Sequence, residues 1–144
     1  MKILFIGPQG SGKGTQAELL GNKSKIPYIS TGNIFRDNIA EETKLGKLAI
    51  KYINAGKLVP DKITNDLVKN RLSHKDIKKG FILDGYPRNL KQAKFLDTIA
   101  KLDIVFEIYI SDKESIFRIS GRRSCKCGAV YHLKFNPPER KGFC

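Results

Sequence analysis

The chain has 144 residues, of which 40% are hydrophobic and 28% charged, a composition that fits one globular domain with a core of ordinary size. Lysine and arginine number 27 against 14 aspartate and glutamate, and the net charge of +13 indicates polyanionic partners such as nucleotides, nucleic acid or acidic lipid. No apolar run approaches the roughly 20 residues that cross a bilayer, and Lys2–Ile6 is far shorter than the apolar region of a signal peptide. We therefore expect a soluble, cytoplasmic protein.

The first half of the chain alternates short apolar runs with stretches of helical periodicity. In chain order we expect a strand at Lys2–Ile6, a helix from residue 13 to 20, a strand at Pro27–Ser30, and helices at 32–36, Lys44–Ala55 and Asp61–Ser73. Ser30 or Thr31 can cap the helix that follows them, and Gly56 ends the next one.

The second half continues the alternation. Phe81–Asp84 is expected to be a strand buried on both faces, followed by a helix at Asn89–Lys101 and by the longest strand candidate, Ile104–Ile110. Ser111 and Glu114 have the spacing of a capping box for a helix through residue 120. After residue 121 the helical period is lost, which predicts a small irregular or hairpin insert. Continuous apolar strands alternating with helices predict an α/β fold with a parallel sheet covered on both faces.

A glycine-rich turn lies between the first strand and the first helix. Residues 7–15 read Gly-Pro-Gln-Gly-Ser-Gly-Lys-Gly-Thr, which gives a glycine, four residues and then Gly12-Lys13. This spacing in a strand–loop–helix context is typical of a P-loop, in which backbone N–H groups surround a phosphate and the lysine reaches the outer phosphates. The Ser or Thr usually found after the lysine is displaced by one position, since Gly14 precedes Thr15.

The sequence resembles the adenylate kinase family, of the bacterial type with a long lid. Its Gly-Lys-Gly-Thr-Gln run matches that family's version of the loop, so the displaced threonine is expected there. Further matching stretches lie at residues 30–36, 56–61, 80–88, 92, 121–123 and 130–138. The resemblance implies a P-loop core at residues 1–30 and 74–120, an AMP-binding insert at 31–73 and an incomplete lid at 121–144.

The resemblance also implies a set of residues around AMP: Thr31, Arg36, Lys57, Leu58, Val59, Gly85, Tyr86, Pro87, Arg88 and Gln92. The chemistry of the polar members fits this role. The two arginines offer planar guanidinium groups suited to a phosphate, and the glutamine can present both a donor and an acceptor to adenine.

The resemblance places a second set around ATP: Gly10, Ser11, Gly12, Lys13, Gly14, Thr15, Arg118, Arg122, Val130 and Tyr131. Phosphoryl transfer depends on positioning and on positive charge around the moving group, for which Lys13, Arg36, Arg88 and Arg122 are the candidate catalytic residues. Asp84 ends a strand where a carboxylate could hold waters of a Mg²⁺ ion that accompanies ATP; a cap or ion-pair role is the alternative.

The implied reaction is ATP + AMP ⇌ 2 ADP, with ATP, AMP and ADP as partners and the complete protein as a monomer. Within enzymes the alternative is a UMP/CMP-type kinase, which shares the loop and the Gly-Tyr-Pro-Arg turn. A catalytically inactive nucleotide-binding fragment is a further alternative. Nucleic-acid binding is a weaker hypothesis because the lysines are dispersed, with no aromatic residues interleaved on a strand. We expect neither a nucleic-acid nor a membrane partner.

The three cysteines lie near the chain end. Cys127 and Cys144 are separated by sixteen residues, as in zinc-bearing lids of the family, but Cys125 and Cys127 have only one residue between them, where the family has two. Structural zinc on these three cysteines is therefore a hypothesis, with reduced thiols as the alternative. The family continues past this point with the rest of the lid, a fifth strand and a closing helix. We therefore expect a fragment, a truncated product or a frame-disrupted product, with impaired activity if the chain ends at residue 144.

Overall fold

A computed structural model describes residues 1–125, 127, 129–140 and 142–143. The chain separates into two compact units, which are described one at a time. The first unit comprises residues 1–6 and 13–107, and the second comprises residues 7–12 and 108–144. No helix in the described part of the chain combines the length and the apolar character that a membrane crossing requires.

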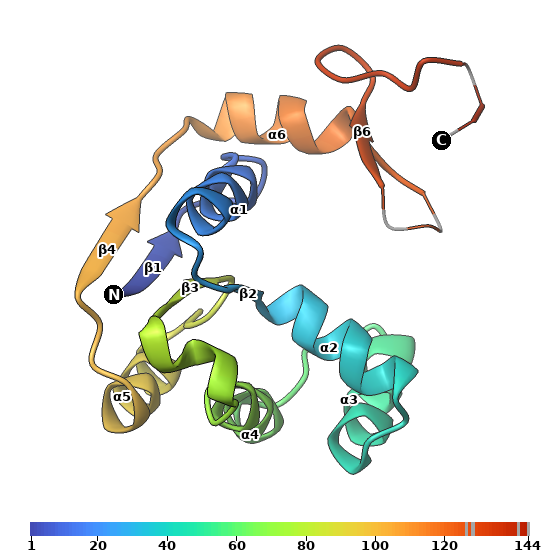
Figure 1. Ribbon diagram of the computed structural model, residues 1–144. Helices are drawn as coiled ribbons and strands as arrows, with labels where there is room; N and C mark the ends of the chain where they lie inside the picture. The colour runs from blue at the N-terminus through green and yellow to red at the C-terminus, as the bar shows by residue number, and fades with distance from the viewer. Residues whose placement is uncertain (126, 128, 141, 144) are drawn as a thin grey trace. The chain divides into compact units, whose positions relative to one another are not determined.

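The first unit is built on a parallel sheet, drawn from blue to light orange in Figure 1. Its strands are β1 (Lys2–Ile6), β2 (Tyr28–Ser30), β3 (Phe81–Asp84) and β4 (Ile104–Glu107), in the order β2-β3-β1-β4. Each neighbouring pair is parallel, because every crossover between strands runs through helix. The predicted α/β fold with a parallel sheet is confirmed.

Helices cover both faces of this sheet. Leu83 of β3 pairs in register with Leu4 and with Ile29, so these side chains share one face, where they form a cluster with buried residues of α4 (Asp61–Arg71) and α5 (Leu90–Ile99). Ile82 points to the other face, where α1 (Lys13–Ser24) packs against the strands. The alternation explains why β3 is buried along its whole length, as its sequence predicted.

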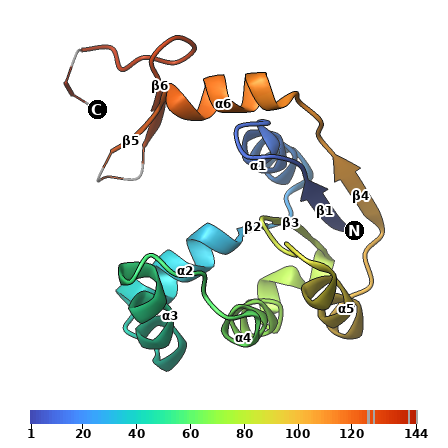
Figure 2. The same cartoon turned by 180° about the vertical axis from the view of Figure 1, so that it is seen from behind.

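Two further helices, α2 (Thr31–Ala40) and α3 (Lys44–Asn54), form a helical hairpin beside α4 (Figure 2). The helices approach closely at Gly46, where an added Cβ would lie 2.0 Å from the carbonyl oxygen of Asn38. Thr43 caps α3 by accepting a hydrogen bond from the backbone N–H of Gly46 at 3.0 Å. A 3₁₀ helix, η1 (Lys75–Lys79), leads into β3 and was not predicted.

Two expectations for this unit are wrong in part. The strand expected at Ile104–Ile110 ends at Glu107, so the longest strand is β1, because the register pairs Glu107 with Ile6, where β1 itself ends. Ser30 does hold the N-cap position of α2, but its side chain makes no capping hydrogen bond. Thr31 does not cap the helix either, since its hydroxyl donates to the carbonyl of Gly85.

The described residues of the second unit form one helix and one hairpin. Helix α6 (Asp112–Ser120) starts as its capping-box spacing predicted, with the Ser111 hydroxyl accepting from the N–H of Glu114 at 3.3 Å. Strands β5 (Arg122–Ser124) and β6 (Val130–His132) pair antiparallel, which confirms the hairpin alternative for the insert. Phe117 of α6 packs its ring against His132 and Phe135.

Candidate active site

The turn after β3 brings several of the predicted residues together. Gly85 has a φ of 78°, a conformation that a glycine adopts without strain, and a cis peptide bond joins Tyr86 to Pro87. The Thr31 hydroxyl donates to the Gly85 carbonyl at 3.0 Å, and Nε of Arg88 donates to the same oxygen at 2.8 Å. A Cβ on residue 85 would lie 2.6 Å from the Thr31 hydroxyl, so only glycine allows this approach.

Asp84 ends β3 directly before this turn and is 9% exposed. Its Oδ2 accepts a hydrogen bond from the Tyr28 phenol at 3.0 Å, whereas the buried Oδ1 has no hydrogen-bond partner among the described residues. Burial, reinforced by the negative charge of Asp84, raises the pKa of Tyr28 to about 12. The phenol therefore stays a donor at neutral pH.

The glycine after the loop lysine also has a structural reason. A Cβ added to Gly14, in the first turn of α1, would lie 3.2 Å from the Tyr28 phenol oxygen and 3.4 Å from Oδ2 of Asp84. The Tyr28–Asp84 pair therefore leaves little room for a side chain at position 14. The hydroxyl-bearing residue follows one position later, at Thr15, which is exposed.

Gln92 is 5% exposed, and both ends of its side-chain amide are bonded. The backbone N–H of Arg88 donates to Oε1 at 2.7 Å, and Nε2 donates to Oδ1 of Asp61 at 2.7 Å. The neighbouring Tyr86 phenol donates to Oδ1 of Asn65 at 2.6 Å. Burial raises the pKa of Tyr86 to about 12, and the charge of Asp61 adds to the effect.

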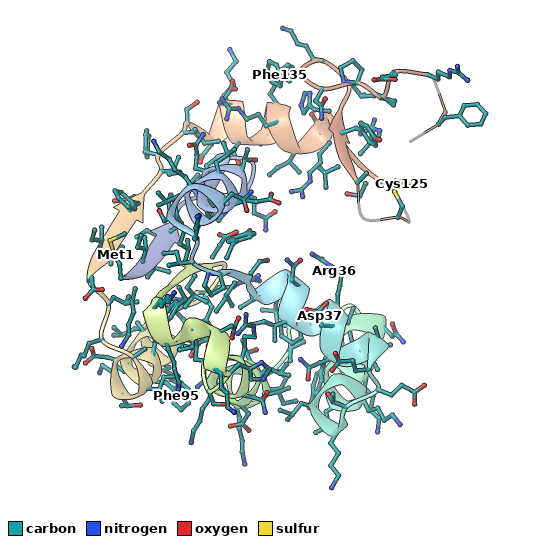
Figure 3. The ribbon with its side chains drawn as sticks, viewed as in Figure 1. Met1, Arg36, Asp37, Phe95, Cys125 and Phe135 are labelled. Carbon is teal, nitrogen blue, oxygen red and sulfur yellow. The ribbon has the colours of Figure 1, made fainter. Side chains whose placement is uncertain are left out.

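The remaining residues predicted near AMP are more exposed to solvent. Arg36 is exposed on α2, and its guanidinium donates to the side-chain carbonyl of Asn33; Figure 3 labels Arg36 on this helix. Lys57 and Leu58 lie in the segment between α3 and α4, where the leucine is 90% exposed. Val59 is half-buried in the same segment. Among the described residues, the backbone of this segment makes no hydrogen bond to the backbone of the turn after β3.

The second unit holds the residues of the loop up to Gly12. Gly10 and Gly12 have φ values of 75° and 88°, which glycine tolerates, and the Ser11 hydroxyl is buried without a hydrogen-bond partner among the described residues. Helix α6 supports this loop: the Ser115 hydroxyl donates to the carbonyl of Gln9 at 2.7 Å. Nη1 of Arg118 donates to the carbonyl of Gly10 at 3.4 Å.

Of the rest of the predicted ATP set, Lys13 is the first residue of α1, and the other four residues lie on α6 or on the hairpin. Arg118 of α6 is half-buried and forms an ion pair with Glu114 at 2.6 Å. Arg122 and Val130 are exposed, on β5 and β6 respectively, and Tyr131 is half-buried. The buried Nε2 of His132 has no hydrogen-bond partner within the described residues, while its Nδ1 accepts from two backbone N–H groups.

The described residues do not assemble a metal-binding cluster of three or more His, Cys, Asp or Glu side chains. Cys125 is half-buried and Cys127 is exposed, and Cys144 lies outside the described residues. The described residues of this segment therefore contain two cysteines, fewer than the four ligands that a structural zinc site uses.

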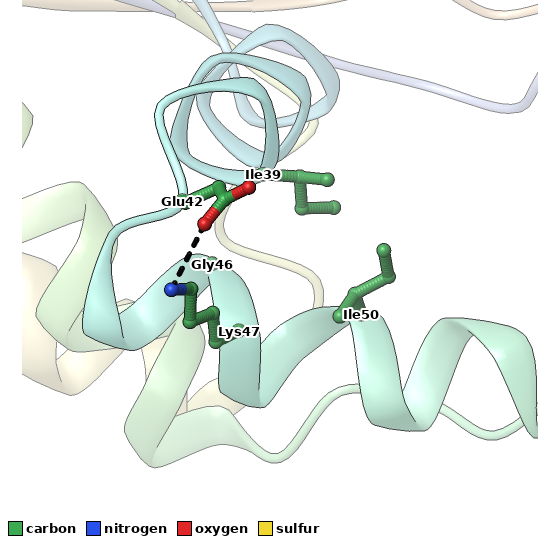
Figure 4. A pocket seen from close by; sticks show the side chains of 5 residues that line it. All are labelled: Ile39, Glu42, Gly46, Lys47 and Ile50. Atoms are coloured by element: carbon green, nitrogen blue, oxygen red, sulfur yellow. Dashed lines mark ion pairs between the residues drawn. The ribbon is translucent and has the colours of Figure 1, made fainter.

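A separate cavity of about 280 Å³ lies between α2 and α3 (Figure 4). It is lined by Ile39, Gly46 and Ile50 and by Lys47 and Glu42, which form an ion pair of 3.0 Å. None of the nucleotide-binding or catalytic residues predicted from the sequence lines this cavity. It therefore lies apart from the turn after β3.

Three residues of the site were missed by the analysis of the sequence. Tyr28 was assigned only to a strand, Asp61 to a helix start and to a stretch that resembles the family, and Asn89 only to the start of a helix. In the structure, the first two hold Asp84 and Gln92, and Nδ2 of Asn89 donates to both carboxylate oxygens of Asp61 at 3.1 Å. The spacing along the chain gave no signal for these contacts, because each joins separate elements.

Comparison with known proteins gives one consistent family. The model of the adenylate kinase family matches residues 5–137. Adenylate kinases from Methanothrix thermoacetophila, Clostridium novyi and Anaeromyxobacter sp. strain Fw109-5 are 49%, 50% and 50% identical to the chain over all of its residues. The chain covers 69%, 69% and 70% of these relatives, respectively.

The family match spans almost the whole chain, and the sheet that carries Asp84 has the parallel topology that the alternation of strands and helices predicted. The chain therefore belongs to the adenylate kinase family of nucleoside monophosphate kinases, which transfer a phosphoryl group reversibly in the reaction ATP + AMP = 2 ADP.

Proposed function

We propose that the turn after β3 binds AMP and that Asp84 serves the Mg²⁺ that accompanies ATP. One observation carries this proposal: Oδ1 of Asp84 is buried without a hydrogen-bond partner in the described part of the chain, at the carboxyl end of a parallel strand. A buried carboxylate oxygen without a donor is costly unless a ligand or a water completes it. Ligands of open parallel sheets bind at this end of the strands.

The carboxylate oxygens of Asp84 suit a magnesium ion. Mg²⁺ prefers oxygen ligands and keeps several of its own waters, so one carboxylate oxygen accepting from such a water suits it. Bound with ATP, the ion would neutralise charge on the phosphates. The Tyr28 hydrogen bond fixes the carboxylate, which leaves Oδ1 as the acceptor for this water.

For AMP, we assign the phosphate to Arg36 and Arg88 and the adenine to Gln92. Arg88 is anchored through Nε to the carbonyl of Gly85, so its two terminal nitrogens remain for a phosphate. The other proposed AMP residues shape the site around the nucleotide: Thr31, Lys57, Leu58, Val59, Gly85, Tyr86 and Pro87.

For ATP, we assign the phosphates to the loop and the first turn of α1. Backbone N–H groups next to glycines with positive φ can turn toward one anion, and the start of α1 adds partial positive charge. The proposed ATP residues are Gly10, Ser11, Gly12, Lys13, Gly14, Thr15, Arg118, Arg122, Val130 and Tyr131.

Transfer itself requires that positive side chains stabilise the charge that spreads over the moving phosphoryl group. We assign this role to Lys13, Arg36, Arg88 and Arg122. We also propose that residues 31–73 form an AMP-binding insert and residues 121–144 part of a lid, on a core of residues 1–30 and 74–120. Closure of these parts would exclude water and so suppress ATP hydrolysis.

Zinc in the lid is a separate proposal that rests on the sequence. Cys125, Cys127 and Cys144 would supply three thiolates, and a fourth ligand would be needed to complete a tetrahedron. Metal analysis of the purified protein tests it: one zinc per chain supports the proposal, and a substoichiometric content contradicts it.

Formation of ADP from MgATP tests the main proposal, with AMP, UMP or CMP as acceptor. We expect turnover with AMP and a loss of about 10²-fold or more in kcat for Asp84→Asn, in line with the loss of one electrostatic group. Asp66→Asn, on α4, is the matched control for the charge change. An unchanged kcat and unchanged Mg²⁺ dependence in Asp84→Asn would contradict the magnesium role.

A further inference from the structure

The side-chain amide of Gln92 is held in one orientation by two groups of opposite character. Nε2 donates to Oδ1 of Asp61 at 2.7 Å, and Oε1 accepts from the backbone N–H of Arg88 at 2.7 Å. A carboxylate only accepts hydrogen bonds and a backbone N–H only donates. Gln92 is buried, so water does not compensate for lost partners.

If the Gln92 amide were rotated by 180°, it would lose both of these hydrogen bonds. Its oxygen would face the carboxylate of Asp61, and its NH₂ group would face the N–H of Arg88. Two hydrogen bonds would be replaced by an acceptor–acceptor and a donor–donor pair. The orientation is therefore determined by the chemistry of the two partners.

The fixed amide leaves a defined pattern for a nucleobase. Nε2 has one N–H left and Oε1 has one lone pair left, once the two internal hydrogen bonds are counted. The edge of adenine offers an acceptor at N1 and a donor at its 6-amino group, which such an amide can match. A 6-oxopurine offers a donor at N1 and an acceptor at O6, the reverse order, and would need the flipped amide.

We propose that Asp61 is a positioning residue that determines the base preference of the monophosphate site, 6-aminopurine over 6-oxopurine, by fixing the Gln92 amide. The inference rests on the proposed role of Gln92 in binding adenine. It adds a residue that would not touch the nucleotide.

Asp61 is itself held in place. Nδ2 of Asn89 donates to both of its carboxylate oxygens at 3.1 Å, and Asn89 also caps α5 by accepting from the N–H of Gln92 at 2.9 Å. Asp61 is the first residue of α4, where a negative charge is favourable at the helix N-terminus. The N-termini of α4 and α5 are thus tied together around the amide.

The test is equilibrium binding of AMP and of inosine 5′-monophosphate, measured by calorimetry, so that it does not depend on turnover. The variants are Asp61→Asn, Gln92→Ala and the control Asp66→Asn, which removes the same charge from the same helix. Asparagine at position 61 can offer either an oxygen or an NH₂ group, so the flipped amide then loses only its bond to the Arg88 N–H.

We expect the wild type and Asp66→Asn to prefer AMP. In Asp61→Asn the ratio of the two dissociation constants should move toward unity by about fivefold to tenfold, the equivalent of one hydrogen bond. If Asp61 had a purely structural role, its replacement would weaken the binding of both nucleotides equally. An unchanged ratio of the two dissociation constants in a folded Asp61→Asn variant overturns the proposal.

The variant Gln92→Ala tests the recognition of adenine by Gln92 separately from the positioning role of Asp61. If this variant loses the preference while Asp61→Asn retains it, the positioning role of Asp61 is wrong and adenine recognition by Gln92 stands. If Gln92→Ala keeps the preference, Gln92 does not read the base, and the proposed role on which this inference rests is wrong as well.

Discussion

The phenol of Tyr28 donates a 3.0 Å hydrogen bond to Oδ2 of Asp84, and it does so from a neighbouring parallel strand. The register pairs Ser30, not Tyr28, with Asp84, so the long tyrosine side chain reaches along the sheet to the end of β3. The contact occupies one carboxylate oxygen and leaves the buried Oδ1 for a ligand. Tyr28 is therefore expected to orient the group that we assign to the magnesium.

Tyr28→Phe removes this donor and keeps the ring. Because Asp84 can then rotate, we expect the Mg²⁺ concentration for half-maximal rate to rise severalfold, and the free energy of unfolding to fall by about 1 kcal/mol. Initial rates across a Mg²⁺ titration, with urea unfolding alongside, measure both. Tyr109→Phe changes a phenol that is 83% exposed and serves as the control. An unaltered Mg²⁺ midpoint in Tyr28→Phe would show that the tyrosine does not orient Asp84.

Alkaline pH should weaken the fold through the phenols of Tyr28, which is half-buried, and Tyr86, which is buried. The pKa values of Tyr28 and Tyr86 are raised from 10.0 to about 12 in the folded protein, so between these values the folded chain holds protons that the unfolded chain has lost. Stability is therefore constant below about pH 10 with respect to these groups and falls as the pH rises from 10 to 12. Urea unfolding across this range measures the slope.

The same titration in Tyr28→Phe gives the control for that slope. The phenylalanine cannot ionise, so the loss of stability above pH 10 should be shallower than in the wild type. Identical slopes in the two proteins would mean that Tyr28 does not titrate with a raised pKa.

Lys13→Ala tests the loop. Removal of an ammonium group that acts on the transferring phosphates should cost about 3–4 kcal/mol of transition-state stabilisation, a decrease of roughly 10²–10³ in kcat. Lys23→Ala, in the last turn of the same helix, should leave kcat near the wild-type value. Initial rates of ADP formation from MgATP and AMP measure both, and a Lys13→Ala enzyme with undiminished kcat would remove the catalytic assignment.

Local patterns in the sequence predicted most of the fold. The run Phe81–Asp84 between helices indicated a strand buried on both faces, and Ser111 with Glu114 indicated where α6 starts, because each signal lies within a few residues. The predicted end of β4 was wrong, because the strand ends where its pairing partner Ile6 ends β1. The hydrogen bond from Gln92 to Asp61 spans 31 positions and depends on how α4 meets α5, which no local pattern encodes.

Gly46→Ala tests the packing of α2 on α3. Alanine favours a helix over glycine by about 1 kcal/mol, so propensity alone predicts a more stable protein. The added Cβ, however, would lie 2.0 Å from the Asn38 carbonyl oxygen, and the backbone would have to move. We therefore expect a net loss of about 1–3 kcal/mol in the free energy of unfolding.

Gly32→Ala in α2 is the matched control for this change. A Cβ there meets its nearest neighbours, the guanidinium of Arg36 and the hydroxyl of Ser30, at 3.4 and 3.5 Å, which is ordinary contact. Its stability should stay within about 0.5 kcal/mol of the wild type or rise. Urea unfolding of the two variants measures which effect is larger at position 46. If the contact with the Asn38 backbone is larger, Gly46→Ala loses stability and Gly32→Ala does not. If helix propensity is larger, the free energy of unfolding rises in both variants.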